Sequence, residues 1–227
     1  MNYAVISGDI VGSTSLDEAD RLILGKKLES LLEILRSKFN LYIRLIKGDY
    51  IECVVNNPSE GLRVALAIKC YIKSIVLDTN ISQTNRRTTN FATHGIRLAI
   101  GYGELTRYTP ENGIIDGEAI YLSGRAIHDA STYNKERIVI KNTLFFVSNN
   151  EVLDNQFTPI TALLDVLLSK TTARQSEIIF LKLMFHSESE IASLLNVSQS
   201  VINQHSTAAG WNAIEKAVVF FNHVIKN

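Results

Sequence analysis

Hydrophobic and polar positions follow two different periods along the first 150 residues. Short apolar segments, several with every second residue apolar, predict β-strands. Longer segments in which apolar residues recur every three or four positions predict α-helices. Residues 78–95 are polar and aperiodic, which predicts a long exposed loop. The predicted elements are strand 3–8, a helix after a capping box of Ser15 and Glu18, strands 41–47 and 50–55, helix 58–77, strand 96–102, helix 117–131, and strands 137–140 and 143–147.

The order of these elements indicates the fold class. Gly48 and Asp49 separate two strands and suit a tight hairpin turn. A hairpin inside an otherwise alternating series of strands and helices is typical of an α+β sandwich of the ferredoxin-like type, and not of a doubly wound parallel sheet. We therefore expect an α+β domain in the first part of the chain.

The last third of the chain has a different pattern. Residues 149–158 are polar, and the sequence beyond them is helical throughout. We expect a first domain at 1–148, a linker at 149–158 and a small all-α domain at 159–227. Helix starts inside the last domain are marked by capping boxes or N-cap residues at Thr172, Ser187 and Ser198.

Composition excludes several classes of protein. The chain has 227 residues, and 23 Lys and Arg balance 23 Asp and Glu, so the basic excess of a general polyanion binder is absent. Two cysteines are too few for a disulfide scaffold or a cysteine-ligated zinc module. Neither a signal peptide nor 18 uninterrupted apolar residues occurs in the sequence. We expect a cytoplasmic protein without a membrane span.

The first candidate for chemistry is the segment of residues 8–14, GDIVGST. It lacks the Gly-Lys-Ser/Thr ending of a P-loop, and its glycines do not fit a dinucleotide fingerprint. It does place Asp9 at the end of a strand, before a turn into a capped helix. Backbone N–H groups at a helix start suit a polyphosphate, and a carboxylate suits a bridging cation. The alternative is an ordinary strand-to-helix turn in which Asp9 caps a backbone donor.

A second carboxylate strengthens the first interpretation. Asp49 directly follows a strand that is expected to lie near the first strand. Two carboxylates at one end of a sheet are suitable ligands for Mg²⁺ or Mn²⁺ beside phosphate oxygens. The alternative is that Gly-Asp is simply favourable turn chemistry.

The segments SGDIVGST, KGDYIECVV, IRLAIGYGE and DGEAIYLSGRA occur in this order within residues 3–147. In order and spacing they resemble the catalytic domain of class III nucleotidyl cyclases. With the helical C-terminal part, the chain resembles the SatD-like bacterial proteins more closely still. The resemblance implies a cyclase-type sandwich, a nucleoside triphosphate or related phosphorylated ligand, and a homodimer with the site between two chains.

The resemblance also implies roles for particular residues. Asp9 and Asp49 would bind the metal, with a backbone carbonyl from Ile10, and the triphosphate would be wrapped by Val11, Gly12, Ser13 and Thr14. Arg125 would stabilise charge on the α-phosphate in the transition state. Leu45 and Tyr121 stand where the family has its base-selecting lysine and ribose-orienting asparagine, so the usual purine and ribose contacts are missing. Lys47 is two positions from Leu45 and would share its strand face as a partial replacement.

Residues 174–209 resemble the helix-turn-helix of sigma factors and response regulators. Its second helix offers polar side chains that read adenine edges or touch phosphates, namely Ser198, Gln199, Asn203 and Gln204. That helix has no Arg or Lys, and five basic residues balance five acidic ones over residues 157–227. Contact with DNA and contact with a second protein chain therefore both stay open.

The leading hypothesis is a bacterial regulatory protein. Its cyclase-like domain would bind a nucleotide or phosphorylated ligand with Mg²⁺ or Mn²⁺ and control a C-terminal helix-turn-helix, through a homodimer. One alternative is an active but divergent nucleotidyl cyclase or nucleotide hydrolase. Another is a scaffold that only dimerises. The five histidines show no metal-ligand spacing with one another or with the cysteines.

Overall fold

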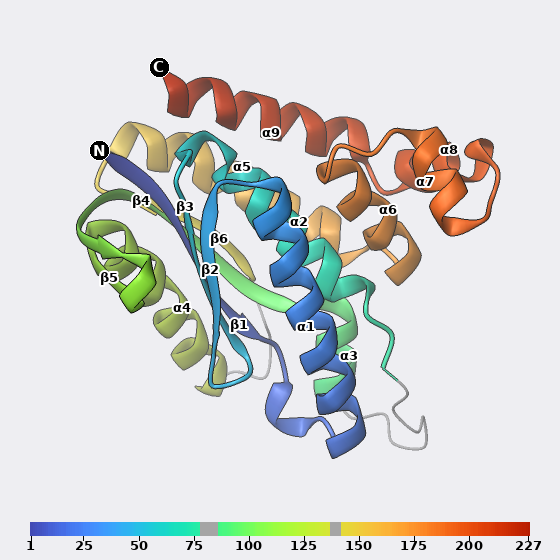
Figure 1. The fold of residues 1–227 in the computed structure, drawn as a ribbon, viewed down its shortest axis with the longest axis horizontal. Helices are drawn as coiled ribbons and strands as arrows, with labels where there is room; N and C mark the ends of the chain where they lie inside the picture. Colours follow the sequence, from blue (N-terminus) through green and yellow to red (C-terminus); the bar gives the residue numbers. More distant parts are fainter. Residues whose placement is uncertain (78–85, 137–141) are drawn as a thin grey trace.

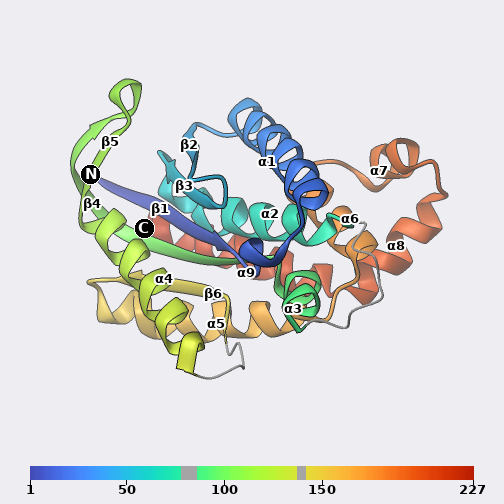
Figure 2. The same cartoon turned by 90° about the horizontal axis from the view of Figure 1, so that it is seen from below.

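The structure is a computed structural model that describes residues 1–77, 86–136 and 142–227. A curved sheet lies between two layers of helices (Figures 1 and 2). Helices α1 (Glu18–Lys38) and α2 (Gly61–Ser74) cover one face, and α4 (Glu118–Glu136) covers part of the other. This two-sided arrangement gives β1 (Asn2–Ile10) a run of buried residues with no polar face along most of its length.

The sheet has the predicted ferredoxin-like order. Strands β2 (Leu41–Ile46), β3 (Tyr50–Val55), β1 and β4 (Ile96–Thr109) are neighbours in the order β2-β3-β1-β4, and every adjacent pair is antiparallel. Together with α1 and α2 they form a βαββαβ unit, which confirms the α+β fold class. Alternation along β1 divides its side chains, so that Ile6 packs with α1 and α2 while Val5 packs with Ala119 of α4.

Two further strands extend the sheet. β5 (Ile114–Gly117) pairs antiparallel with the second half of β4, and β6 (Leu144–Ser148) pairs parallel with its first half. The strand predicted at 96–102 therefore runs longer than expected, and the predicted glycine-broken loop contains β5. The β4–β5 hairpin carries a register shift between Leu105 and Arg107, which disturbs the alternation that identifies strands in a sequence.

Two local predictions about helices were wrong. Helix α3 (Arg86–His94) lies within the segment expected to be a loop. Among residues 90–94 of this helix, Phe91 is the one buried apolar side chain. Gly95, with φ of 65°, ends the helix, and its N–H donates to the Phe91 carbonyl. Helix α1 begins at Glu18, and Asp17 caps it by accepting the N–H of Asp20, so the predicted capping box does not set its start. Residues 78–85 and the predicted strand 137–140 lie outside the described residues.

The C-terminal region is helical, as predicted. It comprises α5 (Glu151–Ser169), α6 (Ala173–Leu183), α7 (Glu188–Leu195), α8 (Gln199–Ala208) and α9 (Trp211–Lys226). The capping boxes at Thr172 and Ser187 are present, and Ser198 is the N-cap residue of α8. Residues 151–158, which the sequence assigned to the linker, form the first turns of α5, because Asn150 caps this helix and Phe157 is buried against the core.

The hydrophobic core runs from the sheet into these helices without a break. Phe146 of β6, Phe157 of α5 and Phe221 of α9 belong to one cluster with Ile100 of β4. The rings of Phe157 and Phe221 have centroids 4.6 Å apart. Helices α5 and α9 therefore stabilise the same side of the sheet as α2 does. Among the described helices, none is long and apolar enough to cross a membrane.

Candidate functional site

The two aspartates singled out by the sequence lie together at one end of the sheet. Asp9 is near the end of β1, paired across the sheet with Tyr50 of β3 and Arg97 of β4. Asp49 is in the β2–β3 turn, and its backbone carbonyl accepts the N–H of Ile10 at 3.1 Å. The antiparallel pairing of β1 and β3 is what brings the start of β3 beside the end of β1.

Three charged side chains interact at this end of the sheet. Burial raises the pKa of Asp9, and the nearby Asp49 carboxylate raises it further, while Arg97 acts in the opposite direction. Arg97 Nη1 lies 3.2 Å from Asp9 Oδ2. Asp49 Oδ2 accepts a hydrogen bond of 2.8 Å from the Ser13 hydroxyl. Two carboxylates that repel each other, one of them already held by a cation, form a place where positive charge is favoured.

This donor set fits a divalent metal of the magnesium type. The available ligands are carboxylate oxygens, the Ser13 hydroxyl and backbone carbonyls, and hard cations prefer such all-oxygen surroundings. Among the described residues, no group of three or more His, Cys, Asp or Glu side chains is placed to hold a metal. A cation at Asp9 and Asp49 would therefore complete its coordination with water or with oxygens of a bound ligand.

The loop that was expected to wrap a triphosphate is only partly available for that role. Val11 is buried, and its N–H donates to the Gly95 carbonyl at 3.0 Å. Gly12 adopts a left-handed conformation with φ of 74°, which turns the chain into a short 3₁₀ helix. The first turn of α1 carries acidic residues at its N-cap and just inside it, so its helix dipole already faces carboxylates. Thr14 is exposed, and Gly12 and Ser13 are partly accessible.

A cavity of about 500 Å³ opens beside Asp49, between α1 and the β2–β3 hairpin. Its volume is within the range of small-molecule sites. The loop contributes Ser13 and Thr14 to its wall, and the other residues that line it are Leu16, Arg21, Leu24, Gly25, Glu29, Leu45, Lys47, Gly48 and Asp49. The sequence interpretation missed Arg21 and Glu29. Their spacing of eight residues, with Gly25 midway, places all three on one face of a helix, and this spacing could have identified them from the sequence.

Other predicted site residues lie on α4. Arg125 is exposed, and its assignment to phosphate chemistry stays a prediction. The helix itself is fixed against β1 by a buried hydrogen bond of 2.8 Å between the hydroxyls of Ser7 and Ser123. Tyr121 is also exposed, and its hydroxyl donates to the Asp116 carboxylate. Leu45 is on the other face of the sheet, toward α1, where it lines the cavity.

In the C-terminal region, α7 and α8 are joined by a three-residue turn in which Asn196 is left-handed with φ of 52°. They pack with α6 around a small apolar cluster of Ile178, Ile191, Ala192 and Ile202. The four residues predicted to contact DNA are exposed, namely Ser198, Gln199, Asn203 and Gln204. The Glu188 carboxylate interacts with two of them, Gln199 and Asn203, and with Lys182, which lowers its pKa.

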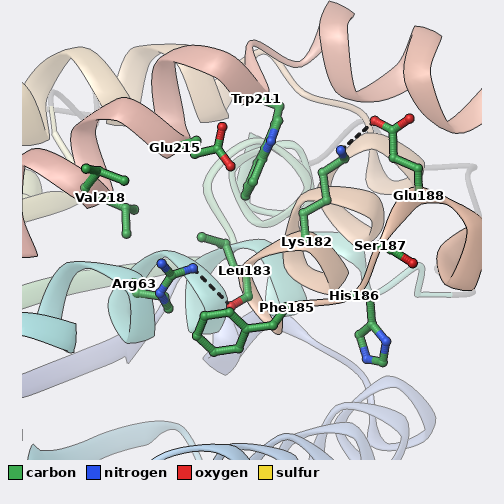
Figure 3. A pocket seen from close by; sticks show the side chains of 11 residues that line it. Arg63, Lys182, Leu183, Phe185, His186, Ser187, Glu188, Trp211, Glu215 and Val218 are labelled. Carbon is green, nitrogen blue, oxygen red and sulfur yellow. Dashed lines mark hydrogen bonds and ion pairs between the residues drawn. The ribbon is translucent and has the colours of Figure 1, made fainter.

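A second cavity, of about 370 Å³, lies between α2, α9 and the α6–α7 connection (Figure 3). Its cations already have partners. Arg63 pairs with Glu60 at 2.9 Å and Lys182 pairs with Glu188 at 2.7 Å. Arg63 also stacks over the Phe185 ring, 4.5 Å from its centroid. The charges around this cavity are therefore used to join the helices that surround it.

No protein-family model matches the sequence, and no curated protein matches it. The solved structures that are similar in fold include three that each have 14% sequence identity to this chain. Two are structures of a bacterial light-regulated adenylyl cyclase. The first has a TM-score of 0.42 and covers 64% of this chain and 42% of its own. The second has a TM-score of 0.40 and covers 63% of this chain and 74% of its own. The third is the guanylyl cyclase Cya2, with a TM-score of 0.36 over 60% of this chain and 77% of its own. This chain thus spans less than half the length of the first.

Proposed function

We propose that this protein binds a nucleoside triphosphate, or a related phosphorylated ligand, together with Mg²⁺ or Mn²⁺ at the Asp9–Asp49 end of the sheet. The observation that carries the proposal is the carboxylate pair at this end of the sheet, one member of which, Asp49, lines a cavity that Arg21 and Lys47 also line. Cations and carboxylates in one small site suit a ligand that brings its own negative charge and a bridging metal.

Each residue has a distinct part in this proposal. Asp9, Asp49 and the carbonyl of Ile10 hold the cation, which when bound neutralises charge on the phosphate oxygens. Ser13 positions the Asp49 carboxylate through its hydrogen bond. Arg97 favours the charged form of Asp9 and so opposes the burial that raises the pKa of this carboxyl.

The proposed biological role is regulation. Ligand binding at the sheet would bias the α7–α8 pair, whose support α6 packs directly on α2. The proposed assembly is a homodimer. On the face opposite α1 and α2, helix α4 packs against β1 and β4, and β2 and β3 present Arg44 and Glu52 as an ion pair. A second copy of the chain would cover this part of the sheet.

The binding proposal is tested by thermal unfolding of the full chain with a panel of nucleotides, with and without Mg²⁺ or Mn²⁺. We expect a metal-dependent rise in Tm with at least one nucleoside triphosphate. Asp49→Asn removes one ligand charge and should abolish this rise. Asp129→Asn makes the same charge change on the exposed surface of α4 and should preserve it. A panel with no stabilising nucleotide refutes the proposal.

The output proposal needs a separate test. The full chain should bind DNA from upstream of its own gene at low salt if Gln199, Asn203 and their neighbours contact it. Loss of binding in Asn203→Ala, with the fold intact by circular dichroism, would support the assignment. Absence of DNA binding at low salt, with or without the nucleotide, would rule out DNA as the target of the α7–α8 pair.

A further inference from the structure

The cavity beside Asp49 has two walls of different origin. One wall is a single face of α1, on which Arg21, Gly25 and Glu29 follow one another at intervals of four residues. The other wall is the β2–β3 hairpin, which contributes Leu45 and Lys47. Both walls belong to one chain.

The chemistry of the cavity changes from one end to the other. Arg21 Nη2 donates to the Thr14 carbonyl at 3.2 Å, which places the guanidinium next to the loop that carries Ser13. Glu29 is eight residues further along α1, about 12 Å away at the rise of an α-helix. Apolar side chains of Leu16, Leu24 and Leu45 line the space along the way. The α1 wall is therefore cationic at one end and acidic at the other, and apolar side chains and the Asp49 carboxylate complete the lining.

Gly25 leaves the middle of this cavity open. It lies inside α1, where glycine is less favourable for helix formation than alanine by about fivefold. A Cβ atom built at Gly25 meets nothing within 4 Å, so no close approach of another element requires a glycine there. What the glycine provides is free volume between α1 and the hairpin, at the depth where the apolar side chains lie.

We propose that this cavity binds a guanine nucleotide within a single chain. The phosphates lie at the Arg21 and Lys47 end, the base lies over Gly25, and its Watson–Crick edge faces Glu29. This inference rests on the proposed function and adds the identity of the base. A carboxylate accepts two parallel hydrogen bonds from the N1–H and N2–H groups of guanine. Adenine presents one N–H donor beside a ring nitrogen that repels a carboxylate, so guanine is favoured by about tenfold.

The test is isothermal titration calorimetry of the full chain in Mg²⁺ with GTP, ITP, XTP and ATP. Inosine keeps N1–H and lacks the amino group, so we expect GTP to bind most tightly, ITP less tightly and ATP about tenfold more weakly than GTP. The decisive variant is Glu29→Gln. Its amide accepts from N1–H and donates to the C2 carbonyl of xanthine, so the preference should shift from GTP toward XTP.

A matched pair of variants tests the position of the base. Gly25→Met fills the cavity and should weaken the binding of every nucleotide by tenfold or more. Gly124→Met places the same side chain on α4, away from this cavity, at a glycine whose added Cβ also meets nothing within 4 Å, and it should leave the affinities unchanged. Equal affinity for all four nucleotides, unchanged in Glu29→Gln and Gly25→Met, overturns this inference and leaves the proposed function standing. Affinity that appears only at protein concentrations where the dimer forms overturns the single-chain site. If none of the four nucleotides binds, both proposals fail.

Discussion

Replacing Asp165 by alanine removes the carboxylate that neutralises the most deeply buried lysine described in the structure. Lys69 of α2 is 1% exposed, and its Nζ lies 3.2 Å from Asp165 Oδ1 of α5. The same ammonium donates to the Thr143 hydroxyl at 2.7 Å and to the Ile96 carbonyl at 3.0 Å. Asp165 also accepts the backbone N–H of Thr143. The group joins α2, β4 and the entry to β6 to the first C-terminal helix.

The expected loss of stability follows from what is left behind. Removing one member of a buried ion pair costs about 3–5 kcal/mol, because the remaining charge has neither water nor a counter-ion. The Thr143 N–H loses its acceptor as well, at roughly 1 kcal/mol or more. Total folding free energies of domains are about 5–15 kcal/mol, so Asp165→Ala should remove a large part of the stability. Burial lowers the pKa of Lys69, so deprotonation offers the variant partial relief.

The assay is urea unfolding followed by far-ultraviolet circular dichroism and by fluorescence of Trp211, which is the single tryptophan of the sequence and lies on α9. Both signals should move together to lower urea in Asp165→Ala, since α9 shares the core with the sheet. The double variant Lys69→Met/Asp165→Leu should be milder than Asp165→Ala, because it leaves no unpaired charge. Gln156→Ala, exposed on the same helix, is the control. A change below about 0.5 kcal/mol in Asp165→Ala would refute the reasoning.

Three further predictions concern stability. Burial and the nearby Lys69 charge lower the pKa of Lys73 from 10.5 to about 8, so between these pH values the unfolded chain retains a proton that the folded protein releases. The free energy of unfolding should therefore rise by up to about 3 kcal/mol from pH 8 to 10.5. Subtracting the stability-against-pH curve of Lys73→Met from that of the wild type should isolate this rise, and identical curves would contradict the prediction. Gly101→Ala would place a Cβ 2.1 Å from the Ala119 carbonyl oxygen and should lower the free energy of unfolding by about 3 kcal/mol. Gly124→Ala, on α4, meets nothing within 4 Å and should raise it by about 1 kcal/mol. Thermal unfolding measures both, and equal effects would disprove the close approach of α4 to β4. Asn196→Ala should lower the free energy of unfolding by about 1 kcal/mol and Asn196→Gly by almost nothing, because the backbone at this position is left-handed. The urea midpoint of the alanine variant should therefore be lower than that of the glycine variant.

The sequence was sufficient for the features that depend on local pattern. Periodicity placed β1, the β2–β3 hairpin, α2 and the capped helices of the C-terminal region, because each of these buries one regular face or uses a local capping motif. The element order was then enough to identify the ferredoxin-like arrangement. The position of Asp9 and Asp49 at the same end of the sheet followed as well, since Asp9 lies near the end of β1 and Asp49 directly precedes β3, its neighbour.

Tertiary contacts decided the features whose cause lies far away in the chain. Helix α3 depends on burying Phe91, and β5 exists only because the long β4 offers it an edge. The residues expected in a linker are helical because Phe157 joins the common core. The availability of a backbone group is also a tertiary property: the Val11 N–H is used by Gly95, more than 80 residues away.

The candidate ligand site divides in the same way. The sequence by itself determined which residues bear charge at the end of the sheet, because strand ends and turn residues can be read from local pattern. Only the fold decided that α1 would lie across from the β2–β3 hairpin and leave a cavity between Arg21, Gly25 and Glu29 on one side and Lys47 on the other. The physical reason is that a cavity is defined by two surfaces, and the hydrophobic face of α1 fixes their separation by packing on β2.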